Sequence, residues 1–211
     1  MKQILGYIEC DYMNLKRGIL YTIGIFTVIS AVFSLKSSIG AVGYMLFGGL
    51  IVASTAFTVT PQTLAFADLA PGSTLQKVLG RYLGSLLIMI LLGLFGLAAV
   101  VVVRLAGFEN GGLDLQHLAA MSGISLFFLS LQNMLLYLLI PMLGMQFANI
   151  IRMLPGFVMF FLVMQPTTLE IISGMLMRSS FPGFIILGIG AVSLAVGVFL
   201  SYLIMRRRVG R

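Results

Sequence analysis

Long apolar runs, separated by short polar connections, constrain this chain more than any other feature. A helix that crosses a membrane needs roughly 20 mostly apolar residues, and five of the six runs reach about that length. Only 9% of the 211 residues are charged, whereas soluble domains carry roughly 25%. The sequence therefore predicts an all-α integral membrane protein with one membrane domain over residues 1–211. The runs cover residues 19–35, 39–59, 83–103, 118–142, 154–164 and 184–205.

The fifth run is the weakest of the six. Residues 154–164 are too few to span by themselves, so the helix reaches spanning length only by extending back through residues 147–151. Residues 165–182 mix polar and apolar side chains, and a short amphipathic or re-entrant helix is expected there. The count of six spans depends on this extension.

Basic residues are distributed unevenly over the connections. With an even number of spans and the N-terminus inside, ten Lys and Arg residues fall inside and only Lys36, Arg104 and Arg178 fall outside. This asymmetry follows the positive-inside rule. It predicts that both termini are cytoplasmic and that Glu109 is outside, and it explains the net charge of +7 without nucleic-acid binding. The ten inside residues are Lys2, Lys16, Arg17, Lys77, Arg81, Arg152, Arg206, Arg207, Arg208 and Arg211.

The N-terminal 18 residues have a helical apolar stripe. Ile4, Ile8, Tyr12 and Leu15 recur at spacings of four, four and three, which places them on one helix face. We expect an amphipathic helix lying in the membrane interface. The alternative is an ordinary frayed terminus.

The connection at residues 61–82 has the composition of a structured loop. It contains Asp68, a turn around Pro71, and an apolar pair formed by Phe66 and Leu69. Residues three apart share a helix face, and proline fixes φ for a sharp turn. The stretch is therefore predicted to contact a soluble partner through Phe66, Asp68 and Leu69. The alternative is a solvated loop without a partner.

Catalytic and nucleotide-binding signatures are absent from the sequence. There is no P-loop, no G-x-S-x-G and no H-E-x-x-H, and His117, the single histidine, is expected to be an exposed loop residue. The apolar runs almost lack ionisable residues, which argues against proton-coupled transport and against a membrane-embedded enzyme. Pairs of small residues are expected to support close helix packing. These pairs are Gly80 and Gly84, Gly93 and Gly96, Ala191 and Ala195, and Ser193 and Gly197.

Methionine is abundant, with 14 residues. Methionine side chains re-pack around varied apolar shapes, so an apolar path for cargo is one interpretation and ordinary packing is the other. The candidates for a cargo path are Met142, Met145, Met159 and Met164.

Three stretches resemble a known family. They are residues 66–73 (FADLAPGS) followed by 78–83 (VLGRYL), residues 141–152 (PMLGMQFANIIR), and the C-terminal residues 201–207 (SYLIMRR). Together with six spans they resemble the permease subunit of bacterial ABC exporters of the type-2 superfamily. The chain is most similar to permeases of antimicrobial-peptide and lantibiotic immunity systems and of phenol-soluble modulin exporters. It departs from the family where a basic residue usually follows the proline, because here Gly72, Ser73 and Thr74 follow and Lys77 comes later.

The resemblance implies a half-transporter in the bacterial cytoplasmic membrane. Two copies would form the path for an amphipathic or hydrophobic peptide, and a separate ATPase subunit would bind ATP and Mg, so this chain would bind no cofactor and would not be an enzyme. The N-terminal helix would be an elbow helix, and a short cytoplasmic coupling helix would contain Phe66, Asp68, Leu69 and Pro71. A second ATPase contact would involve Gln146, Asn149 and Arg152. Lipid or polysaccharide export, an immunity pump, a membrane-embedded enzyme and a passive scaffold are the alternatives.

Overall fold

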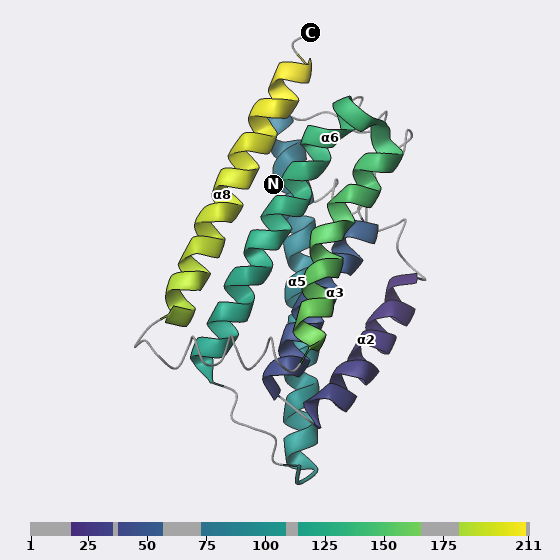
Figure 1. Ribbon diagram of the computed structural model, residues 1–211, viewed down its shortest axis with the longest axis vertical. Coiled ribbons are helices and arrows are strands. Elements are labelled where there is room, and N and C mark those ends of the chain that lie inside the picture. Colours follow the sequence, from purple (N-terminus) through teal and green to yellow (C-terminus); the bar gives the residue numbers. More distant parts are fainter. Residues whose placement is uncertain (1–17, 36–37, 57–72, 109–113, 166–181, 210–211) are drawn as a thin grey trace.

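A computed structural model describes residues 18–35, 38–56, 73–108, 114–165 and 182–209. The described chain forms five α-helices and no strand (Figure 1). The all-α prediction is confirmed for this part of the chain. The helices are α2 (Gly18–Ser34), α3 (Ser38–Ala56), α5 (Thr74–Leu105), α6 (Leu115–Met164) and α8 (Pro182–Val209).

Helix α6 is divided by a sharp bend at Gly144. This residue has φ 78° and ψ 169°, a combination that is open almost only to glycine because other residues clash through Cβ. We name residues 115–143 the first leg and residues 145–164 the second leg. The legs run back along each other (Figure 1), since Gly156 of the second leg lies against the Gln132 amide of the first.

Each apolar run of the sequence lies wholly or almost wholly within a described helix, but two boundaries differ from the prediction. Helix α5 begins at Thr74, nine residues before the predicted run, because Ser73 caps it. The Ser73 hydroxyl accepts from the Gln76 N–H and the Gln76 side chain accepts from the Ser73 N–H, which is a capping box. The helix that holds the fifth run likewise begins before the run, since it includes residues 147–151, the extension that spanning length required.

Three helices are long and apolar enough to cross a membrane among the described residues. They are Thr74–Leu105, Leu115–Leu162, which includes the bend, and Pro182–Arg207; a shorter apolar helix covers Ala41–Ser54. Large apolar side chains remain exposed along their outer faces, for example Leu87, Val102 and Ile189. These features fit a membrane-embedded protein, because lipid can cover such faces.

Glycines bring the helix backbones close together. A Cβ on Gly190 of α8 would lie 2.8 Å from the Gly123 Cα of α6, and a Cβ on Gly96 of α5 would lie 2.9 Å from the Met45 Cβ of α3. Both separations are too short for a real Cβ. Small residues therefore set the packing distance, as they do in membrane helix bundles. The prediction for Gly93 and Gly96 is confirmed, whereas Ala191 and Ala195 are exposed.

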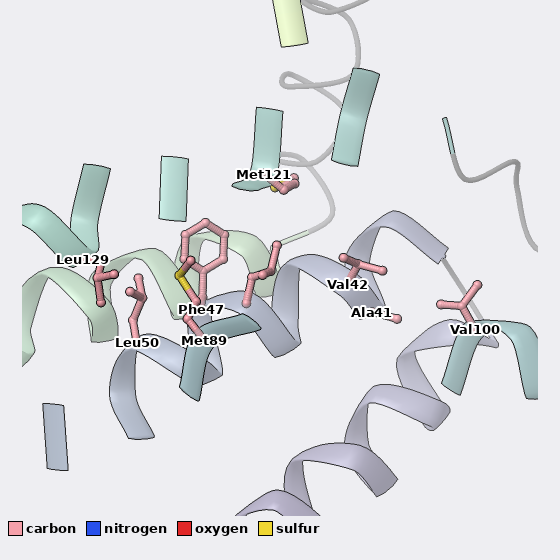
Figure 2. Packing of buried hydrophobic residues seen from close by; sticks show 9 residues of the cluster. Ala41, Val42, Phe47, Leu50, Met89, Val100, Met121 and Leu129 are labelled. Atoms are coloured by element: carbon pink, nitrogen blue, oxygen red, sulfur yellow. The ribbon is translucent and has the colours of Figure 1, made fainter. Parts of the chain in front are cut away.

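The apolar core lies around α3. Phe47 and Leu50 are fully buried there, and they pack with Met89 of α5 and with Met121 and Leu129 of the first leg (Figure 2). An aromatic group extends this core toward α2 and the second leg. Its Tyr44 and Phe160 rings have centroids 4.8 Å apart, and the Phe26 ring is 5.4 Å from the Tyr44 ring.

The two ends of the bundle differ in charge. At one end α5 begins, α6 bends and α8 ends, and α3 points toward this end but stops short of it (Figure 1); we call it the basic end. Lys77 and Arg81 lie in the first turns of α5, and Arg206 and Arg207 lie near the end of α8. Arg104 lies at the opposite end of α5.

Candidate functional site

Polar side chains gather inside the bundle near its basic end. We define the polar cluster as Ser54 of α3, Ser85 of α5, Gln132 and Asn133 of the first leg, and Arg152 of the second leg. With Ala53 they line one small pocket, and each is at most 4% exposed. Four helical segments therefore contribute to one buried polar site.

Arg152 is the largest fully buried side chain, with 1% exposure. Its guanidinium Nη2 donates a hydrogen bond to the backbone carbonyl of Ser54. Helix α3 ends at Ala56, so this carbonyl belongs to the last four, which have no partner within the helix. Cations stabilise helix C-termini, and Arg152 thus caps α3 from another helix.

Gln132 and Asn133 form the side of the cluster that belongs to the first leg. The Asn133 Nδ2 donates to the Leu129 carbonyl at 3.2 Å. The Gln132 Nε2 is buried and has no hydrogen-bond partner among the described residues. It lies where a side chain on Gly156 would stand, so glycine at that position is what allows the amide to fit between the two legs.

A second set of hydrogen bonds joins α5, the first leg and α8 beside the cluster. The Tyr82 hydroxyl is 3.0 Å from the Ser201 Oγ and 3.4 Å from the Ser130 carbonyl. The Ser130 hydroxyl donates to the Ser193 carbonyl at 2.7 Å. These bonds hold the start of α5 against the end of α8, so the basic end is cross-linked by polar contacts as well as by packing.

The predicted second ATPase contact is divided between surface and interior. Gln146 is exposed, whereas Asn149 is 8% exposed and Arg152 is 1% exposed. A direct contact with another protein requires surface exposure, which only Gln146 has among the three. A signal for burial was present, because the backward extension of the fifth run places residue 152 inside the span. The role of these residues in contacting an ATPase stays a prediction.

The methionines proposed as a cargo path lie in different surroundings. Met142 is 71% exposed, Met145 packs beside Leu136 and Ile140, and Met159 packs against the core around Phe47. Met164 is the last residue of α6. No common surface joins these methionines among the described residues, and the path stays a prediction.

The remaining predicted sites lie outside the described residues. These are the elbow residues Ile4, Ile8, Tyr12 and Leu15 and the coupling residues Phe66, Asp68, Leu69 and Pro71. Helix α3 leads in sequence directly into the segment that contains the coupling residues. The polar cluster holds the last turn before that segment.

His117 is not the exposed loop residue that the sequence predicted. It lies in the first turn of α6 and is 6% exposed, with Nδ1 3.3 Å from the Asp114 carboxylate. Asp114 is the N-cap of α6 and accepts from the Gln116 N–H. The same carboxylate therefore caps the helix and contacts His117. Within the described ranges, no group of three or more His, Cys, Asp or Glu residues is placed to hold a metal.

Comparisons with known proteins give no relative. No family, no curated protein and no solved structure matches the chain.

Proposed function

We propose that this chain is the membrane-spanning subunit of an ATP-driven exporter. In this proposal the six helical segments each cross the cytoplasmic membrane, with the basic end and both termini in the cytoplasm. A second copy completes the path, and a separate ATPase binds at the basic end. The cargo is an amphipathic or hydrophobic peptide.

The charge inventory of the bundle is the observation that carries this proposal. Asp114, at a helix start, is the only acidic residue in the described part of the chain. Ion-coupled and proton-coupled carriers use buried carboxylates or histidines along their pathway, and hydrolytic enzymes use an acid–base or nucleophile–base pair. The one such pair among the described residues is His117 with Asp114, at the end opposite the basic end, and no other carboxylate lies along the described helices. In this proposal an ATPase therefore supplies the energy for transport.

The basic end supports the proposed orientation. Lys77, Arg81, Arg206 and Arg207 lie there, against Arg104 at the other end. Cytoplasmic connections are enriched in Lys and Arg. The same end carries the bend of α6, so an ATPase bound there would contact residues 141–152, one of the stretches that resemble the family.

Purification tests the function. The tagged chain is extracted from its native host in mild detergent, and we expect an ATP-hydrolysing subunit and two copies of the permease in the complex. Hydrolysis should rise when amphipathic peptides are added. Recovery of a homogeneous, folded chain without any ATPase, at several detergent concentrations, would count against the exporter.

Cysteine labelling tests the orientation independently. Cys10 is replaced by serine, and single cysteines are placed at Phe108, which is 55% exposed beyond α5, and at Arg207, which is exposed near the end of α8. We expect an impermeant maleimide to label Phe108→Cys in intact cells and Arg207→Cys only after lysis. The reverse pattern would invert the proposed orientation.

A further inference from the structure

We propose that Arg152 is a positioning residue that fixes the last turn of α3 to the second leg of α6. In this way it fixes the end of α3, which precedes residues 57–72 in the chain. This proposal deepens the proposed function. Only one part of it depends on that function, namely that residues 57–72 contact an ATPase. We call the hydrogen bond from Arg152 to the Ser54 carbonyl the tie. The tie follows from the described contacts alone.

Burial of the Arg152 guanidinium restrains the side chain. Arginine keeps its charge in proteins, and removing that charge from water is costly unless polar groups replace the water. At 1% exposure, the guanidinium of Arg152, which only donates hydrogen bonds, depends on acceptor oxygens such as the Ser54 carbonyl. Such burial restricts the guanidinium to one position, because moving it would leave a charge among apolar helices.

The atom that accepts from Arg152 lies at the end of α3. The Ser54 carbonyl lies two residues before the end of α3, where the helix dipole is negative. A bond to this atom grips the end of the helix and not its middle. The Ser54 hydroxyl donates to the Ile51 carbonyl of its own helix at 2.7 Å, and the Ser54 backbone carbonyl accepts from Arg152.

Close packing surrounds the hydrogen bond between Arg152 and Ser54. One helical turn after Arg152, Gly156 would place a Cβ 3.6 Å from the Leu50 Cβ of α3 and against the Gln132 amide. The second leg therefore lies between α3 and the first leg with little free space. Arg152 and Gly156 contact α3 one turn apart, so the two elements would move as one body.

The tie predicts protection of a residue that makes none of these bonds. Ala53 precedes Ser54, lines the same pocket and is 2% exposed. A cysteine at this position is close to alanine in size, and it should be shielded from water-soluble maleimide while the tie is closed. Its labelling rate then reports on the end of α3 without any ATPase.

The experiment uses the full chain in membranes, with Cys10→Ser and Ala53→Cys as the parent. Arg152→Gln removes the charge and shortens the side chain, and we expect labelling to accelerate at least about tenfold through local opening. Arg207→Gln removes the same charge at an exposed position and should leave labelling unchanged. Arg152→Lys still presents a donor to the Ser54 carbonyl and should restore protection.

Each outcome decides the proposal. Arg152→Gln with parental labelling overturns the tie, and so does an Arg152→Lys protein that labels as fast as Arg152→Gln. If Arg152→Gln is not recovered from membranes, the comparison of Arg152→Lys with the parent decides, and fast labelling overturns it. In the ATPase complex we expect Arg152→Gln to keep the ATPase bound while peptide-stimulated hydrolysis falls. If Arg152→Gln accelerates the labelling of Ala53→Cys but no ATPase copurifies with the parent, the tie stands and the proposed function is refuted.

Discussion

The close approach of α6 and α8 at Gly190 gives a sharp test of the packing. A Cβ at this position would lie 2.8 Å from both the Cα and the carbonyl carbon of Gly123. Ordinary contact begins at 3.4 Å, so Gly190→Ala leaves a shortfall of at least 0.6 Å (3.4 − 2.8) against backbone, and the Gly123 carbonyl oxygen lies closer still. Backbone cannot rotate away as a side chain can, and the helices must separate or slide.

The expected cost comes from overpacking, which is about 1–3 kcal/mol for an added methyl group in a close-packed interior. Gly188→Ala is the matched control, because it lies two residues away on the same helix and nothing stands within 4 Å of its Cβ. Both variants gain the same helix propensity, roughly 1 kcal/mol. The difference between them therefore isolates the contact with Gly123.

The assay is thermal stability in detergent, measured as the monodisperse fraction that survives heating. For a chain of this size, 1 kcal/mol corresponds to about 2–4 °C in Tm, so Gly190→Ala should melt about 2–12 °C below Gly188→Ala. The chain has no tryptophan, which favours chromatography over fluorescence. Equal melting temperatures would show that α6 and α8 do not approach as described and would refute the reasoning.

Two further predictions concern single residues of the bundle. Gly144→Ala should destabilise the protein by about 1–3 kcal/mol, because φ 78° with ψ 169° is strained for alanine even though nothing stands within 4 Å of its Cβ; the same melting assay measures it, and an unchanged Tm would contradict the hairpin bend. Tyr82→Phe should cost about 0.6–1.7 kcal/mol, the range for hydrogen bonds between membrane helices, because it removes the contact with Ser201. The double variant with Ser201→Ala should cost little more than Tyr82→Phe alone, and fully additive losses would argue against the bond.

The sequence predicted the helices well because hydrophobic patterning determines them. The runs at 19–35, 39–59 and 184–205 lie almost entirely within α2, α3 and α8. The start of α5 was missed because the nine residues from Thr74 carry charges that read as a loop. Their helical state follows from the Ser73 cap, a local hydrogen-bond pattern that hydropathy does not register.

The polar cluster was beyond the reach of the sequence for a different reason. Arg152 near the end of an apolar run is typical of an interface residue, and nothing local says that it turns inward. Its burial depends on a carbonyl that is 98 positions away in the chain and on Gly156 making room. Such contacts exist only once the helices are placed. His117 illustrates the same limit at the other end of α6.

The length of α5 bears on the kind of membrane that suits this protein. From Lys77 to Arg104 the helix is continuous over 28 residues, a rise of about 40 Å at 1.5 Å per residue step. That distance is close to the separation of the two phosphate layers of a bilayer, roughly 40–45 Å with headgroups included. One cation at each end would sit among lipid phosphates when the helix stands upright, and thinner bilayers would require it to tilt. A single helix would then measure bilayer thickness, and the tilt of the whole bundle would follow the lipids that surround it.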